Sequence, residues 1–193
     1  MLRELDVPYS AIQDSAHDLS NAGFGRQMAR VAISILEDRG IAFNSSCTRL
    51  LAMGAGHSKA ELGFAEKLGI PLSQVVLLDK AFPSYAKERL AEQYPEVELI
   101  ERGMFDFLSD HGVSREFSMV TLIGVEYIAR KVEAASALAE ELAGKMLPGG
   151  LVLVVPCGAN MDAEWKQKGF EVVEGFKTWV DMAVYRYSGA VEE

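Results

Sequence analysis

Residues 50–61 read Leu50-Leu51-Ala52-Met53-Gly54-Ala55-Gly56-His57-Ser58-Lys59-Ala60-Glu61, an aliphatic run that leads through a Gly-x-Gly turn into a helix-forming stretch. When a strand turns into a helix in this way, backbone N–H groups at the helix start can face an anion or a polar ligand. Glycine is needed in such a turn because a Cβ would block the approach of the ligand. The same turn also occurs as a plain tight connection, so both interpretations stay open at this point.

An acidic residue, Asp79, ends the next aliphatic run, 25 residues after Gly54. A carboxylate at the end of a second parallel strand can accept both hydroxyl hydrogens of a ribose. Asp79 could instead cap the following helix, although Pro83 and Ser84 offer a better helix start. Together, the glycine turn and this acid favour the binding of an adenosine-containing cofactor.

The rest of the chain alternates short aliphatic runs with amphipathic stretches, which is the pattern of βαβ units and of a largely parallel sheet. A final pair of strands, 170–173 and 182–187, is joined by a connection too short for a crossover helix, which predicts an antiparallel hairpin. The other expected strands are 49–53, 74–78, 97–100, 118–123 and 151–155, and the expected helices are 59–68, 84–94 and 131–146.

The first forty residues are predicted to be helical. Apolar residues recur on one helical face from about Gly25 to Arg39, and Gly40 then ends the helix as a C′ residue would. Farther upstream, Ser10-Ala11-Ile12-Gln13 has the pattern of a capping box. These residues form a helical extension before the first strand.

Composition narrows the class of protein. The 193 residues are 49% hydrophobic and carry a formal net charge of −9, which suits a single globular domain and disfavours nucleic acid as a partner. The two cysteines, Cys47 and Cys157, belong to no metal-binding cluster, so we expect no metal site and a reducing, cytoplasmic compartment. Because the sequence lacks an export signal and a long apolar segment, we expect no membrane association.

Residues 49–187 resemble the class I S-adenosylmethionine-dependent methyltransferases. The resemblance is carried by the glycine turn in 50–58, by Asp79, by the strand and loop at 97–108 and by Leu147-Pro148-Gly149-Gly150. It implies an α/β fold, a Rossmann-like three-layer sandwich with a mostly parallel seven-stranded sheet and an antiparallel C-terminal strand. We expect one domain, with residues 1–46 as the N-terminal helical extension and 47–193 as the core.

The resemblance also implies that S-adenosylmethionine is the cofactor and S-adenosylhomocysteine its product. Phe82 and Phe105 could sandwich the adenine, or they could be ordinary core aromatics. The acid that meets the adenine amino group falls on Gly103 in one register and on Asp106 in another. The residues implied to contact the cofactor are Gly54, Ala55, Gly56, Asp79, Lys80, Phe82, Phe105 and Asp106.

The first motif departs from the family pattern at two positions. Ala52 stands where the family usually carries an acid that meets the methionyl amino group, and Ser58 replaces the third glycine. Each lost hydrogen bond would weaken cofactor binding by about 1 kcal/mol, or by more if the bond were charged.

Candidate catalytic residues follow the fourth expected strand and lie within the glycine turn. Glu126 could act as a general base or hold a cationic acceptor, and Tyr127 could line the acceptor pocket, because the carboxyl ends of parallel strands face the ligand crevice. Both could equally begin the next helix and face solvent. His57 could touch the cofactor or act as a base, or it could be a local hydrogen-bonding residue.

Three functions are therefore compared. The first is methyl transfer from S-adenosylmethionine to a small-molecule acceptor, and the second is a non-catalytic regulatory or assembly subunit with the methyltransferase fold, suggested by Ala52 and Ser58. The third is an NAD-linked oxidoreductase, which the glycine turn and Asp79 favour and the C-terminal hairpin opposes. The sequence identifies neither the methyl acceptor nor the oligomeric state.

Overall fold

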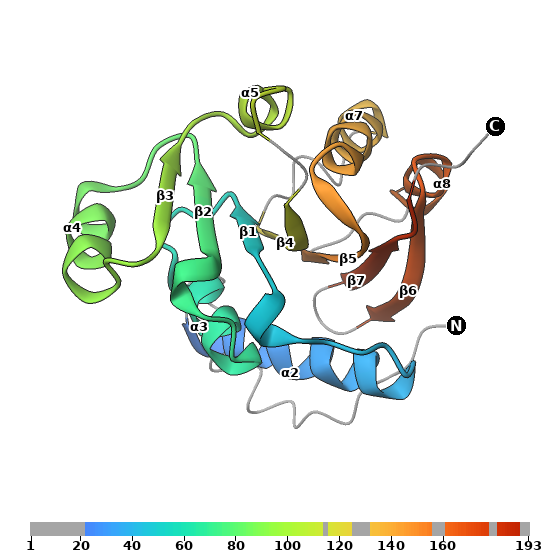
Figure 1. The fold of residues 1–193 in the computed structure, drawn as a ribbon, viewed down its shortest axis with the longest axis horizontal. Coiled ribbons are helices and arrows are strands. Elements are labelled where there is room, and N and C mark those ends of the chain that lie inside the picture. The colour runs from blue at the N-terminus through green and yellow to red at the C-terminus, as the bar shows by residue number, and fades with distance from the viewer. Residues whose placement is uncertain (1–21, 114–115, 125–131, 156–160, 178–180, 190–193) are drawn as a thin grey trace.

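The computed structural model describes residues 22–113, 116–124, 132–155, 161–177 and 181–189. They form a seven-stranded sheet in the order β3-β2-β1-β4-β5-β7-β6, with helices on both faces (Figure 1). The strands are β1 (Leu50–Met53), β2 (Val75–Asp79), β3 (Glu98–Glu101), β4 (Phe117–Ile123), β5 (Met146–Val155), β6 (Phe170–Lys177) and β7 (Asp181–Tyr187). The helices are α2 (Ala22–Asp38), α3 (Lys59–Leu68), α4 (Ser84–Gln93), α5 (Met104–Leu108), α7 (Val132–Ala143) and α8 (Met161–Gln167), with 3₁₀ turns at Ser45–Cys47 and Leu72–Gln74.

The strand pairing confirms the expected Rossmann-like sheet. β1 lies at its centre and pairs in parallel with β2 and with β4, while β3 and β5 extend the parallel part on either side. β7 pairs antiparallel with β5 and with β6, so the predicted C-terminal hairpin is confirmed. The strand order reverses between β1 and β4, and open α/β sheets bind ligands beyond the carboxyl ends of their strands at such a point.

Helices cover both faces of the sheet, and this explains the unbroken aliphatic runs. Every residue of β1 is buried, with Leu50 and Ala52 facing the core under α2, α3 and α4, and Leu51 and Met53 facing the core under α5, α7 and α8. A strand buried on both sides shows no apolar–polar alternation. The two cores therefore hold β1, the strand that leads into the glycine turn, from both sides of the sheet.

The C-terminal end of the predicted helix over 131–146 differs from the structure. α7 ends at Ala143, the chain turns through Gly144 and Lys145, and Met146 begins β5. The buried Lys145 holds this turn, because its Nζ donates to the carbonyl oxygens of Asp110 (2.6 Å) and Val113 (2.9 Å). Met146 is fully buried. A buried methionine fits a helical stripe as well as a strand, so the apolar period carried the predicted helix too far.

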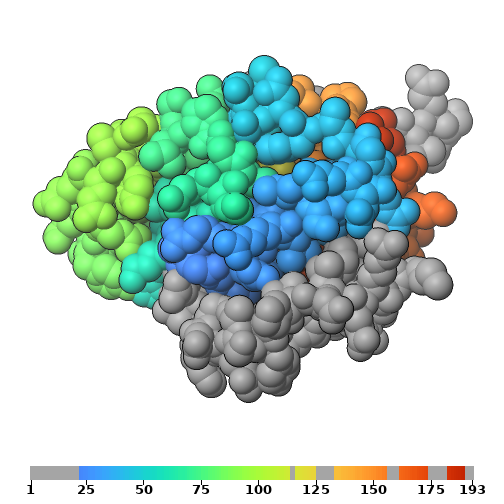
Figure 2. Space-filling view, turned by 90° about the horizontal axis from the view of Figure 1, so that it is seen from below, coloured from blue at the N-terminus to red at the C-terminus, as the bar shows by residue number. Residues whose placement is uncertain are grey.

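α2 and α3 cross with their backbones in close contact. A Cβ built on Gly25 would lie 1.7 Å from the carbonyl oxygen of Ala60, and one built on Gly63 would lie 2.3 Å from that of Ala22. Each helix thus places a glycine against the backbone of the other. Figure 2 shows α2, in blue, across the face of the molecule seen from below. The helix predicted from Gly25 to Arg39 is confirmed, and it is part of the helical layer that carries α3.

Within the ranges that the structure describes, none of the helices has the length and apolar character needed to cross a bilayer.

Candidate functional site

The glycine turn lies at the carboxyl ends of β1 and β2. The amides of Gly54 and Ala55 both donate to the carbonyl oxygen of Leu78, at 2.9 and 3.2 Å, which ties the turn to the neighbouring strand. Gly54 and Gly56 have φ values of 74° and 38°, in the left-handed region that favours glycine. The turn is therefore folded back over the end of β2, where Asp79 stands.

The Asp79 carboxylate is bonded directly to the glycine turn. Its Oδ2 accepts from the Gly56 amide at 2.8 Å, and its Oδ1 accepts from the Ala81 amide at 3.1 Å. The N-cap residue of α4 is Pro83, so Asp79 does not cap that helix. A carboxylate has about four lone-pair positions, so it can still accept further hydrogen bonds from a ligand. Asp79 is half-buried.

Ser58 occupies the third glycine position and keeps the left-handed backbone conformation that favours glycine. It is the N-cap residue of α3, its φ of 63° is left-handed, and its side chain makes no capping bond. Its hydroxyl is buried and has no hydrogen-bond partner among the residues that the structure describes. A buried hydroxyl without a partner is unfavourable, so Ser58 carries an energetic cost at this position.

His57 contacts two residues of α4. The Tyr85 hydroxyl is hydrogen-bonded to His57 Nδ1, and the two rings stack with centroids 5.5 Å apart. Arg89 Nη2 donates to the His57 carbonyl oxygen at 2.5 Å. The structure thus gives His57 local partners that fix the turn against α4, and its ring is exposed to solvent.

Glu61 is a buried acid that the sequence analysis did not select. It lies in the first turn of α3 and is 4% exposed. Phe64 and Ala65, three and four residues later, are also buried, so Glu61 shares the sheet-facing side of α3. Burial raises the pKa of its carboxyl to about 8, and the charge of Asp79 adds to the rise, against the lowering effect of the Glu61 backbone amide. Glu61 is therefore largely protonated at neutral pH in the folded protein.

An acid among the apolar positions of α3 is the sequence signal that could have found Glu61. Residues 60–65 and 68 of this helix are buried, and all of them except Glu61 are apolar or glycine. Ala52, at the expected acid position, is itself fully buried on the α3 side of the sheet and pairs with Thr121. The helix carries a carboxyl on the side of the sheet where the strand has none.

The remaining predicted cofactor residues lie around the same edge in different environments. Lys80 is exposed, and Phe82 is 5% exposed and packs in the core under α4. Phe105 is 36% exposed in the first turn of α5. Asp106 follows it, and its carboxylate lies close to Gly103, because a Cβ built on that glycine would be 2.6 Å from Asp106 Oδ2. Both registers of the predicted adenine acid thus fall at the start of α5.

The two catalytic candidates after β4, Glu126 and Tyr127, lie outside the described residues. β4 itself ends at Ile123, and Gly124, with a φ of 75°, turns the chain at the crevice edge. Across the described ranges there is no group of three or more His, Cys, Asp or Glu side chains that could hold a metal ion.

The fold is that of the class I S-adenosylmethionine-dependent methyltransferases, which confirms the resemblance at the level of architecture. Magnesium protoporphyrin IX methyltransferase from Synechocystis PCC 6803, solved with S-adenosylmethionine, matches with a TM-score of 0.62 at 14% identity, covering 96% of this chain and 87% of that one. The 1,6-didemethyltoxoflavin-N1-methyltransferase of Burkholderia thailandensis, solved with 1,6-didemethyltoxoflavin and S-adenosylhomocysteine, matches with 0.61 at 13% identity, covering 97% and 93%.

A third similar structure is the antibiotic-resistance methyltransferase Kmr, with a TM-score of 0.58 at 11% identity, covering 80% of this chain and 92% of that one. No protein-family model matches the sequence, and a search of the curated proteins finds no match. The relationship is therefore visible in the fold rather than in the overall sequence.

Proposed function

We propose that the chain is a methyltransferase that binds S-adenosylmethionine at the glycine turn and transfers its methyl group to a small-molecule acceptor. One observation carries the proposal: the Gly56 amide and the Asp79 carboxylate, 23 residues apart, meet at 2.8 Å at the edge of a sheet ordered β3-β2-β1-β4-β5-β7-β6. Structures of the same fold contain S-adenosylmethionine or S-adenosylhomocysteine, and two of them are methyltransferases named for small-molecule substrates.

The residues at the turn suit the nucleoside part of this ligand. Asp79 keeps free acceptor positions for ribose hydroxyls, and the space beside Gly56 is open, since a Cβ there would meet no atom closer than 4.0 Å. The exposed ring of Phe105 could stack on a base, whereas Phe82 is already packed in the core.

We assign to Glu61 the role of meeting the methionyl amino group of the ligand, which Ala52 cannot do. A ligand ammonium group at the glycine turn would favour the charged form of a nearby carboxyl, so Glu61 would lose its proton as the ligand binds. The ligand supplies a methyl group on a sulfonium, ready for in-line displacement. The protein chiefly has to hold donor and acceptor in line and, if the acceptor carries a proton, provide a base, for which Glu126 remains the candidate.

Calorimetric titration of the purified chain with S-adenosylmethionine, S-adenosylhomocysteine and NAD tests the proposal. We expect micromolar binding of the first two and none of NAD. Binding of NAD alone would favour an oxidoreductase instead, although the antiparallel β7 beside β5 opposes it. If none of the three ligands binds, the non-catalytic subunit is favoured, in which Ala52 and Ser58 mark a lost cofactor site.

Gly56→Ala should weaken binding of S-adenosylhomocysteine about tenfold or more, because the added methyl enters the space beside Asp79 Oδ2. Because Gly56 has a φ of 38°, alanine at this position also destabilises the backbone by about 1 kcal/mol. The control variant therefore has to replace a glycine that also has a positive φ. Gly40→Ala is such a variant: Gly40 has a φ of 63°, and its added Cβ would meet nothing within 4 Å among the described residues. Equal affinities in the two variants would remove the glycine turn from the proposed site.

A further inference from the structure

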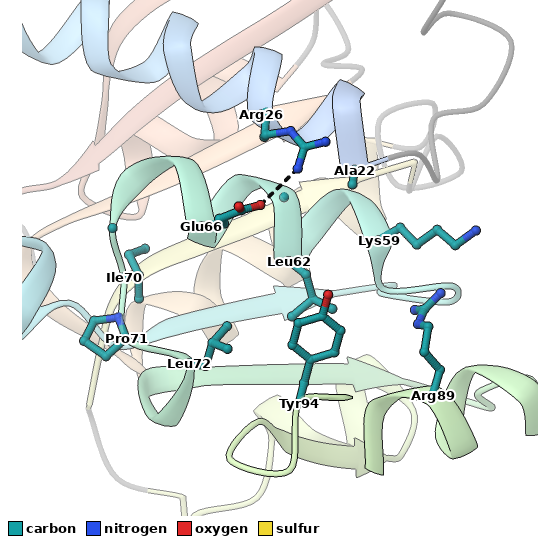
Figure 3. A pocket seen from close by; sticks show the side chains of 12 residues that line it. Ala22, Arg26, Lys59, Leu62, Glu66, Ile70, Pro71, Leu72, Arg89 and Tyr94 are labelled. Carbon is teal, nitrogen blue, oxygen red and sulfur yellow. Dashed lines mark hydrogen bonds and ion pairs between the residues drawn. The ribbon is translucent and has the colours of Figure 1, made fainter. Parts of the chain in front are cut away.

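A second pocket, of about 710 Å³, lies between α2, α3 and α4 on one side of the sheet (Figure 3). Neither glycine of the turn nor Asp79 contributes to its walls. It is therefore separate from the crevice assigned to the methyl donor. Small-molecule sites commonly have volumes of about 300–1,000 Å³, so this pocket has the size of a ligand site.

One end of the pocket is apolar. Ile70, Pro71 and Leu72, in the segment between α3 and β2, form one wall, and Leu62 of α3 stands opposite the ring of Tyr94 (Figure 3). A surface of this kind buries a flat or aliphatic body, and it carries no charge that such a body would have to desolvate.

The other end of the pocket carries two cations, Lys59 and Arg89, which Figure 3 shows on the same side, away from Ile70 and Pro71. Arg89 donates to a backbone carbonyl, and neither side chain is paired with a carboxylate within the described part of the chain. The remaining charges at the pocket, Arg26 and Glu66, neutralise each other in an ion pair of 3.0 Å.

These two cations stand out against the charge of the whole chain. The protein has a formal net charge of −9, so most of its surface repels an anion. An anion would be drawn to the end of the pocket where Lys59 and Arg89 provide charged donors. Because the charged and the apolar surfaces lie at opposite ends of one pocket, the pocket suits an amphipathic ligand.

We propose that this pocket binds a second small molecule, made of an apolar ring-sized body and a carboxylate, with the body against Leu62, Ile70 and Leu72 and the carboxylate at Lys59 and Arg89. The lining of this site includes none of the residues assigned to the methyl donor, although Arg89 also bonds to the His57 carbonyl of the glycine turn.

The test is a ¹⁵N NMR titration with 2-naphthoate, and with 2-naphthylmethanol as an uncharged probe of the same shape. We expect 2-naphthoate to shift the amide signals of Leu62, Ile70 and Leu72 in a saturable way, and the alcohol to bind about tenfold more weakly or worse. Lys59→Gln should weaken naphthoate binding to a similar degree, and Leu72→Gln should weaken both probes.

Lys67→Gln is the matched control, because it removes the same charge from the same helix at a residue outside the pocket. It should leave the naphthoate affinity unchanged. The proposal is overturned by equal affinities for the acid and the alcohol, by equal effects of Lys59→Gln and Lys67→Gln, or by shifts confined to the glycine turn. An absence of saturable shifts would overturn it as well.

Discussion

Replacement of Asp79 by alanine is expected to lower the affinity for S-adenosylhomocysteine by about 100-fold or more, since two hydrogen bonds to a charged acceptor are lost and each contributes about 1.5–3 kcal/mol. Asp79 also accepts from the amides of Gly56 and Ala81. The variant should therefore unfold slightly more easily, by about 1 kcal/mol, because these amides are partly exposed and can bond to water instead. Calorimetric titration and thermal unfolding measure the two effects separately.

Asp110→Ala is the matched control for this variant. Asp110 likewise accepts a backbone amide with one oxygen, from Gly112 at 2.8 Å, and its other oxygen pairs with Arg102 at 2.8 Å. It should show a comparable loss of stability with unchanged ligand affinity. A result in which Asp79→Ala loses stability but keeps its affinity would mean that Asp79 only braces the turn.

Glu61→Gln is expected to change how stability depends on pH. The pKa of the Glu61 carboxyl is about 8 in the folded protein and near 4.5 in the unfolded chain. Between these values the folded protein holds a proton that the unfolded chain has released, so wild-type stability falls as pH rises, by at most about 1.4 kcal/mol per pH unit. The glutamine variant lacks this titrating group, so its free energy of unfolding at pH 8 should exceed that of wild type by on the order of 2–4 kcal/mol.

Denaturant unfolding at several pH values between 5 and 8.5 measures this difference. Glu92→Gln, the same change at an exposed position of α4, should follow the wild-type curve. A Glu61→Gln curve parallel to wild type would contradict the burial argument. Ligand binding adds an independent readout: if Glu61 meets the ligand ammonium group, affinity for S-adenosylhomocysteine rises with pH toward 8 in wild type and not in Glu61→Gln.

Local sequence signals were sufficient to predict the centre of the fold. The run from Leu50 to Met53 is aliphatic on both faces, Gly54 and Gly56 follow it directly, and Asp79 ends the next such run. These features depend on neighbours in the sequence, so strand, turn and acid could be predicted together. The antiparallel hairpin was equally local, because a short connection leaves no room for a crossover helix.

The partners of the site residues could not be predicted in this way. His57 is fixed by Tyr85 and Arg89, which lie 28 and 32 residues later and meet it only because α4 packs beside the turn. Glu61 becomes notable through burial, which a helical pattern implies but does not measure. The predicted helix extends past the end of α7 because Met146 continues the apolar period, and Lys145 looks like a surface residue until its two carbonyl partners are known.

The close crossing of α2 and α3 fixes the position of α3, and α3 starts at the glycine turn of the proposed ligand site. Gly25 and Gly63 leave room for hydrogen atoms alone at two separate points, so the helices can approach fully in one relative register. A rotation or sliding of α2 by one residue would bring a side chain against a carbonyl group of α3 and force the pair apart. The position of α3, the helix that begins at the glycine turn, is therefore fixed relative to α2. A movement of one helix requires the other helix to move with it.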